Sequence, residues 1–136
     1  MTFLVERLSE LNKHLDHLEE LRPRISTPAL RGDLSLHNDV LFSLLTVCQL
    51  VIDVASEISA RNGLAFDDYT EAVRNLGRLG LVDETTLATL DVLPGFRNVL
   101  VHEYVSLDLE RVVQATKHLQ PVREFLETAR RYAASR

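Results

Sequence analysis

Apolar residues recur with helical spacing along most of the chain. Near the N-terminus the leucines follow one another at steps of four and three, at Leu4, Leu8, Leu11, Leu15 and Leu18. This spacing predicts one apolar stripe on a helix over about residues 2–22, because residues three and four apart share a helix face. Pro23 and Pro28 end that helix, since proline lacks an amide hydrogen and restricts the residue before it. A polar connector is expected over residues 24–32.

The next segment is apolar on more than one face, from about residue 33 to Ala60. A helix with this pattern is buried over most of its surface, so we expect it to be the central helix of the fold. Asp33 or Ser35 is placed to cap its N-terminus by accepting hydrogen bonds from the free amides of the first turn. The Arg-Asn-Gly sequence at residues 61–63 is typical of a helix end.

Helical spacing continues through the second half of the chain, with glycine and proline at the boundaries. The predicted segments are a short helix from Asp67 or Asp68 to about Leu79, a helix that opens at residues 83–86, a run from Phe96 to Tyr104, and a last helix from about Leu109 to Ala134. Pro94 and Gly95 interrupt the second segment, so a kink or break is expected there. Pro121 is expected to bend the last helix or loosen one turn.

These elements define the expected fold class. No segment alternates between apolar and polar residues with a convincing period of two, so no strand is predicted. The length of 136 residues fits one domain, at roughly 100–200 residues per domain. We expect a single domain over residues 1–136 with an all-α fold, an antiparallel helical bundle of four main helices plus a short helix.

Composition and charge narrow the possible functions. Apolar residues make up 46% and charged residues 26%, which is typical of a folded globular protein. The formal net charge of −5 excludes a generally basic nucleic-acid-binding protein. Residues 1–96 carry 8 basic and 15 acidic side chains, whereas residues 97–136 carry 7 basic and 5 acidic ones. Any contact with RNA or DNA is therefore expected in a local patch.

Cysteine usage and hydropathy bear on the compartment. Cys48 is the lone cysteine, which excludes an intrachain disulfide, and its apolar surroundings favour a buried core thiol over a reactive one. The longest apolar region, residues 40–55, is interrupted by polar residues and falls short of the ~20 apolar residues of a membrane span. No signal peptide is predicted at the N-terminus. We expect a soluble protein of a reducing cytoplasm with no membrane contact.

The stretch from Gly95 to Tyr104 carries an arginine, an asparagine, a histidine and a tyrosine around an apolar insert. On a regular helix Asn98 and His102 share a face, because they are four residues apart. Arg97 and His102 lie about 140° apart around the helix axis and so flank one surface. Tyr104 returns to the stripe of Arg97 if the helix persists that far.

These side chains suit RNA cleavage without a metal. The 2′-hydroxyl must lose a proton, and histidine has the side-chain pKa nearest neutrality. The guanidinium of Arg97 can hold the extra negative charge of the phosphorane, and Asn98 can orient the imidazole of His102 or donate to phosphate. The second proton transfer needs another acid, for which water, Tyr104 and a second copy of the chain are all open. No cofactor is expected.

At these residues the sequence resembles a known family. Arg97, Asn98, His102 and Tyr104 match the Arg-x4-His-x-Tyr motif of HEPN-domain ribonucleases, and the chain is similar to the HepT-type toxins of prokaryotic HepT–MntA toxin–antitoxin pairs. Residues 50–55, 66–69 and 76–82 also resemble segments of that family. The resemblance covers roughly residues 30–130. Pro94, just before the motif, departs from the family pattern and bears on how straight the motif helix is.

The resemblance implies roles for these residues. Arg97 and His102 match the catalytic pair, and Asn98 matches their polar partner. Tyr104 matches the tyrosine that an MntA-like nucleotidyltransferase antitoxin modifies with AMP, which blocks RNase activity. The resemblance further implies a HEPN-like bundle, a homodimer with two motifs facing one cleft, and RNA substrates, either mRNA or tRNA. The expected activity is that of a metal-independent endoribonuclease toxin.

Other candidate residues lie outside the motif. A buried carboxylate needs a partner, so Asp53 is expected either to hold Arg97 or another arginine or to face solvent at the helix edge. Arg111, Lys117 and Arg123 follow the motif and are candidate RNA-binding residues on a local basic groove. His14 and His17 are three residues apart, but no third ligand is identifiable, so a solvated helix face is favoured over a metal site.

Two classes of function remain open at this point. The first is the endoribonuclease toxin, in which His102 acts as general base or acid and Arg97 holds the scissile phosphate. The second is a non-catalytic helical binding subunit that partners a nucleotidyltransferase and binds nucleotide phosphate without cleaving RNA. RNA cleavage by the wild-type chain distinguishes them.

Overall fold

The computed structural model describes residues 2–135, which form helices joined by short connecting segments, with no strand in that range. The all-α prediction is confirmed. The α-helices are α1 (Thr2–Leu21), α2 (Thr27–Gly32), α3 (Leu34–Arg61), α4 (Tyr69–Arg78), α5 (Glu84–Leu90), α6 (Leu93–His102), α7 (Leu109–Lys117) and α8 (Gln120–Ala134), and short 3₁₀ turns occupy Arg22–Arg24 and Tyr104–Ser106.

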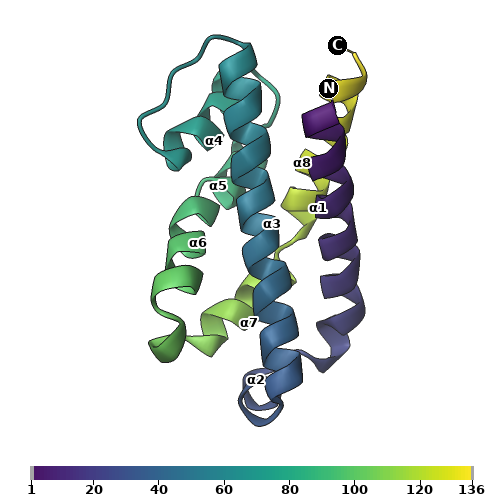
Figure 1. Ribbon diagram of the computed structural model, residues 1–136, viewed down its shortest axis with the longest axis vertical. Helices are drawn as coiled ribbons and strands as arrows, with labels where there is room; N and C mark the ends of the chain where they lie inside the picture. The colour runs from purple at the N-terminus through teal and green to yellow at the C-terminus, as the bar shows by residue number, and fades with distance from the viewer. Residues whose placement is uncertain (1, 136) are drawn as a thin grey trace.

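Helix α3 is the centre of the bundle, as its apolar pattern predicts. It packs against α1, α2, α4 and α6, and α8 packs against α1 and α5 (Figure 1). Seen as in Figure 1, α1 and α8 lie on one side of α3, and α4, α5 and α6 descend along the other side. The leucine stripe of α1 is buried along its whole length, so the periodicity of that segment faces the core.

Aspartates define the N-termini of four helices. The Asp33 carboxylate accepts a hydrogen bond from the Leu36 amide at 3.1 Å, and the Asp68 carboxylate accepts one from the Glu71 amide at 2.8 Å. Asp83 and Asp108 cap α5 and α7 in the same way. Each carboxylate satisfies an amide that has no partner within its helix, so these starting points could be predicted from the local sequence.

Three boundaries differ from the predicted ones. A short helix, α2, forms inside the predicted polar connector, where the Ser26 hydroxyl caps it by accepting from the Ala29 amide at 3.2 Å. The predicted last helix divides into α7 and α8, and Pro121 lies in the first turn of α8. Pro94 likewise lies in the first turn of α6. Proline is well tolerated there because the amides of the first turn have no intrahelical acceptor, so the N–H that proline lacks would not have formed a helix hydrogen bond.

The core contains the lone cysteine. Cys48 is fully buried on α3, and burial raises the pKa of its thiol to about 12, which confirms the expectation of a core residue. By length and mean hydropathy α3 is the one described helix apolar enough to cross a membrane, but 56% of its most apolar window is buried inside the bundle. That share fits the central helix of a helical bundle.

Candidate functional site

Helix α6 carries the motif and is anchored by its apolar face. Leu93, Phe96 and Leu100 are buried, at steps of three and four, and they hold the helix in the bundle beside α3. Between them Arg97 is half-buried, and Asn98 is exposed. The helix packing therefore leaves the polar residues of the motif at the surface.

Two hydrogen bonds hold the Arg97 side chain. Its Nε donates to Gln49 Oε1 on α3 at 3.0 Å, and its Nη1 donates to Asn98 Oδ1 at 3.0 Å. A guanidinium has five N–H donors, so three donors on the Nη1 and Nη2 end have no acceptor among the described residues. That end is the one that can bind two oxygens of a phosphate side by side.

Asp53 reaches Arg97 through Gln49. The Gln49 amide donates from Nε2 to Asp53 Oδ1 at 2.9 Å, while its Oε1 accepts from Arg97. Of the two expectations for Asp53, the structure places it near Arg97, linked by an intervening amide, and it records no direct ion pair between the two. Gln49 was not among the predicted site residues, because nothing in its local sequence indicates a partner 48 residues away.

A shallow pocket lies beside Arg97, where α3 and α6 meet. Its volume is about 260 Å³, and its walls combine apolar side chains with polar ends. It is lined by Leu45, Thr46, Gln49, Leu50, Arg97 and Val101. The Arg97 guanidinium thus borders a hollow on the surface of the protein, where a ligand can reach it.

His102 and Tyr104 stand at the end of α6. His102 is the last residue of the helix, is exposed, and makes no hydrogen bond or ion pair within residues 2–135. The helix ends there, and Tyr104 begins the 3₁₀ turn, with 66% of its surface exposed. Tyr104 therefore does not return to the Arg97 stripe along a continuous helix, as the spacing alone would place it.

The predicted RNA-binding residues do not all share one environment. Arg111 and Lys117 are exposed on α7, and the Arg111 guanidinium lies 5.0 Å from the centre of the Phe96 ring on the motif helix. Arg123 is engaged elsewhere: it donates to Asn12 and forms ion pairs with Asp16 at 2.9 Å and Glu19 at 3.1 Å on α1. Those acceptors hold its guanidinium against α1, which makes Arg123 less available to RNA than Arg111 and Lys117.

The N-terminal histidines face α3. His14 Nδ1 lies 3.0 Å from the Ser43 hydroxyl, and His17 Nε2 lies 2.7 Å from Asp39 Oδ1. No group of three side chains suited to hold a metal occurs within the described part of the chain. His14 and His17 therefore contribute to the contact between α1 and α3.

Comparison with known proteins identifies the family. The model for the family described as "Ribonuclease HepT-like" matches residues 11–129, which is most of the chain and includes every motif residue. The chain belongs to the HepT-like ribonuclease family. The family predicted by resemblance is thereby confirmed, and the protein is a ribonuclease by family.

Individual HepT-like relatives agree with this assignment. The chain is 27% identical over 103 residues to the mRNA nuclease HepT of Shewanella oneidensis, a match that covers 71% of this chain and 74% of the relative. It is 30% identical over 114 residues to an Archaeoglobus fulgidus protein provisionally named an RNase, covering 83% of this chain and 81% of the relative.

Solved structures show the same fold. The tri-AMPylated HEPN toxin of Shewanella oneidensis, in complex with MNT antitoxin, superposes with a TM-score of 0.83 at 20% identity, covering 96% of this chain and 98% of that chain. YutE of Bacillus subtilis, a cytosolic protein of unknown function, superposes with a TM-score of 0.73 at 17% identity, covering 93% and 90%. The helical bundle described above is therefore the HEPN toxin fold.

Proposed function

We propose that this HepT-like chain is a metal-independent endoribonuclease that cleaves mRNA or tRNA by attack of a 2′-hydroxyl on the adjacent phosphate. The observation that carries the proposal is the state of Arg97. Two hydrogen bonds fix its side chain beside a surface pocket, three of its donors remain open, and the same helix ends in the exposed His102. A preorganised cation and a titratable base on one helix are what this reaction requires.

Each group has a defined task in the reaction. His102 accepts the proton of the 2′-hydroxyl, and the resulting oxygen attacks phosphorus while Arg97 binds the phosphate oxygens as their charge increases. The bond from phosphorus to the 5′-oxygen then breaks, and that oxygen takes a proton from an acid. The products are a 2′,3′-cyclic phosphate and a free 5′-hydroxyl, so atoms and charges balance. Asn98 holds Arg97 from the side, and Gln49 with Asp53 holds it from α3.

The acid in the second step is proposed to come from a second copy of the chain. Helix α3 carries Leu45, which is half-buried and lines the Arg97 pocket, and Phe42 three residues earlier, with 64% of its surface exposed. A homodimer formed over this apolar strip brings two motifs toward one cleft, so that one His102 can remove a proton while the other supplies one. Arg111 and Lys117 then extend the cleft as contacts for RNA phosphates.

Regulation is proposed to act at Tyr104. The solved relative from Shewanella oneidensis is an AMPylated toxin bound to MNT antitoxin, and Tyr104 here is exposed and two residues from His102. Transfer of AMP from ATP to the Tyr104 hydroxyl by an MntA-like nucleotidyltransferase, with release of pyrophosphate, adds a negative phosphate beside the site. That phosphate competes with RNA for Arg97 and crowds His102.

We place this toxin–antitoxin pair in the cytoplasm, and residues 1–136 act as a single domain.

The decisive experiment uses His102→Ala. The wild-type chain is expected to cleave RNA to fragments with cyclic-phosphate ends in the presence of a chelator, and His102→Ala is expected to lose cleavage with its helical circular dichroism unchanged. His118→Ala provides the matched control, because His118 is also exposed at the end of a helix. Retained cleavage by His102→Ala would overturn the assignment, and RNA or nucleotide binding without cleavage by the wild type would favour the binding-subunit alternative.

The Tyr104 proposal has its own test. Coexpression with an MntA-like nucleotidyltransferase is expected to increase the intact mass by one or more AMP units, to abolish cleavage, and to leave Tyr104→Phe unmodified. A mass increase that maps to another residue would contradict the role of Tyr104 while leaving the catalytic proposal standing.

A further inference from the structure

A second pocket has Asn98 in its wall. It has a volume of about 580 Å³ and lies between the segment that leads into α4 and the first turns of α6. It is lined by Phe66, Asp67, Asp68, Tyr69, Thr70, Pro94, Gly95 and Asn98. We call it the α4–α6 pocket. Asn98 joins it directly to the proposed catalytic site, because the Asn98 amide oxygen also accepts from Arg97.

The walls of the α4–α6 pocket combine aromatic and acidic groups. Tyr69 is the first residue of α4, and 51% of its surface is exposed. Phe66, which also lines the pocket, is half-buried. The Asp68 carboxylate is used as the cap of α4, but the Asp67 carboxylate has no hydrogen-bond or ion-pair partner among the residues described. The pocket thus offers an aromatic face and an unused pair of acceptor oxygens.

Gly95 keeps one wall of this pocket open. A Cβ placed on Gly95 would meet no atom within 4 Å, and its backbone φ is not positive, so neither packing nor conformation requires glycine there. Gly77 differs, since a Cβ there would lie 2.7 Å from Leu87 Cδ2. Glycine within a helix costs stability relative to alanine, and a helix glycine without a packing reason fits close approach of a ligand to the backbone.

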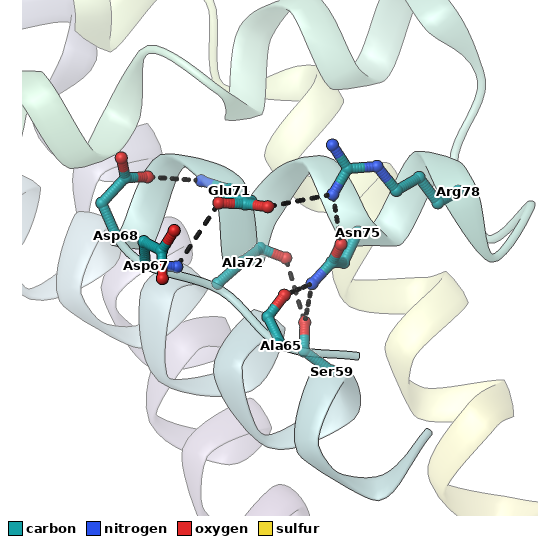
Figure 2. A network of polar contacts seen from close by, with 8 residues as sticks. All are labelled: Ser59, Ala65, Asp67, Asp68, Glu71, Ala72, Asn75 and Arg78. Atoms are coloured by element: carbon teal, nitrogen blue, oxygen red, sulfur yellow. Dashed lines mark hydrogen bonds and ion pairs between the residues drawn. The ribbon is translucent and has the colours of Figure 1, made fainter. Parts of the chain in front are cut away.

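A buried network fixes the segment that forms the pocket wall. Asn75 is almost completely buried and donates to the Ser59 hydroxyl and to the Ala65 carbonyl oxygen, while Arg78 donates to the Asn75 oxygen at 2.6 Å (Figure 2). Arg78 also pairs with Glu71, whose other carboxylate oxygen accepts from the Asp67 amide. These contacts join α3, the connecting segment and α4, so the backbone of Asp67 is positioned at the pocket wall while its carboxylate stays available to a ligand.

We propose that the α4–α6 pocket binds one nucleobase of the RNA substrate, next to the scissile phosphate, and prefers a base that offers hydrogen-bond donors to Asp67. This inference rests on the proposed ribonuclease function. A base can stack on Tyr69, since aromatic stacking is how proteins hold unpaired RNA bases. A phosphate is disfavoured because the carboxylate of Asp67 would repel it. Guanine fits best, because its N1–H and amino group present two adjacent donors to the two carboxylate oxygens.

Binding tests the pocket independently of cleavage. The probes are short fluorescent oligouridines with one central residue changed to guanosine, with every 2′-hydroxyl methylated so that none can react, and affinity is read by fluorescence anisotropy. The guanosine probe is expected to bind the wild-type protein roughly tenfold more tightly than the all-uridine probe, in line with one paired carboxylate–base contact. Adenosine and cytidine, each with one amino group, are expected to fall between them.

Four variants assign the preference to the pocket. Asp67→Asn and Gly95→Leu, which fills the opening, are expected to bring the guanosine-to-uridine ratio close to one. Tyr69→Ala is expected to weaken every probe roughly tenfold, and Tyr69→Phe is expected to restore binding because the ring is retained. Glu20→Gln removes an exposed carboxylate of α1 outside the pocket and serves as the charge control. Circular dichroism identifies any variant that fails to fold. Asp67→Asn is expected to fold normally, because the Asp67 carboxylate makes no hydrogen bond or ion pair among residues 2–135.

The outcomes separate this proposal from the proposed function. Equal binding of guanosine and uridine probes, or a preference that persists in both Asp67→Asn and Gly95→Leu, would overturn the base pocket even if His102-dependent cleavage is observed. A guanosine preference that depends on Asp67, in a protein that binds but does not cleave unmethylated RNA, would support the pocket and overturn the ribonuclease mechanism.

Discussion

Arg97 and Gln49 are 48 residues apart in the sequence and are joined by a hydrogen bond of 3.0 Å from the arginine Nε to the glutamine Oε1. The bond connects the motif helix to the central helix of the bundle. With the Asn98 contact also made, three donors at the Nη1 and Nη2 end of the guanidinium remain for a ligand. The Gln49 amide in turn donates to Asp53. The orientation of the proposed phosphate-binding group is thus set by a residue outside the motif.

Replacing Gln49 by methionine is therefore expected to impair catalysis. Methionine has a similar length but no acceptor, so Arg97 loses one of its two fixed contacts and the affinity for the transition state falls. We expect kcat/KM for RNA to decrease about tenfold, equivalent to about 1.4 kcal/mol, and the free energy of unfolding to decrease by about 1 kcal/mol. Gln120→Met is the matched control, because Gln120 is exposed at the start of α8. Equal kinetics for Gln49→Met and wild type would remove the positioning role.

Local signals account for the parts of the fold that could be predicted. Asp33, Asp68 and Asp83 start helices because each carboxylate lies next to the amides it caps, so a few consecutive residues contain the information. A kink or break was expected at Pro94, and the chain does break there between α5 and α6, whereas Pro121 was expected to bend or loosen one helix; each proline lies in the first turn of a new helix. A proline in the sequence indicates that a regular helix is interrupted at that residue. Tertiary packing determines whether the helix bends there or a new helix begins.

The candidate site divides in the same way. Arg97, Asn98 and His102 could be located because they are close in sequence on one helix. Gln49 could not be, because the pairing of α3 with α6 places it beside Arg97 and no local pattern reports that pairing. Tyr104 was expected on the Arg97 stripe if the helix persisted that far, but the helix ends at His102 and Glu103 adopts a non-helical conformation. The residue at which α6 ends depends on tertiary packing, which the spacing of apolar residues does not reveal.

The Asp83 cap predicts a pH-dependent contribution to stability. The hydrogen bond from the Thr86 amide, at 2.8 Å, lowers the pKa of Asp83 below its usual value. Because the pKa in the folded state is below that in the unfolded state, the ionised carboxylate stabilises the fold above the unfolded pKa, and this contribution is lost as the pH falls through the folded pKa.

Asp83→Asn isolates that contribution, since asparagine still caps a helix but does not ionise. Wild type is expected to be more stable than Asp83→Asn at neutral pH, and the difference is expected to vanish in acid, as measured by urea unfolding over a pH series. Glu20→Gln, at an exposed position on α1, controls for the loss of one negative charge. A difference that does not change with pH would show that the charge of Asp83 is irrelevant to the cap.

Cys48 is expected to be chemically inert in the native protein. Its thiol is fully buried, and burial raises its pKa to about 12, so the reactive thiolate is nearly absent at pH 8. Iodoacetamide at pH 8 is expected to leave the native mass unchanged over a time in which the protein unfolded in guanidinium is fully alkylated. Rapid labelling of the native protein would indicate that α3 opens readily around Cys48.

Arg123 and Lys117 are expected to behave differently when each is replaced by glutamine. The Arg123 guanidinium is held by Asp16 and Glu19, so Arg123→Gln is expected to lower the free energy of unfolding by about 1 kcal/mol at low salt and by less at high salt. It is expected to leave RNA affinity unchanged, since its donors are already satisfied by α1.

Lys117→Gln is expected to show the converse behaviour. Lys117 is exposed on α7 with no ion pair among residues 2–135, so its removal is expected to leave stability within about 0.5 kcal/mol of wild type. If it contacts a phosphate, the slope of log Kd against log salt for single-stranded RNA decreases by about 0.7, because one fewer counterion is displaced on binding. Anisotropy titrations at several salt concentrations measure this slope. An unchanged slope for Lys117→Gln, together with a decreased slope for Arg123→Gln, would place the RNA on the α1–α8 face and make Arg123 the phosphate contact.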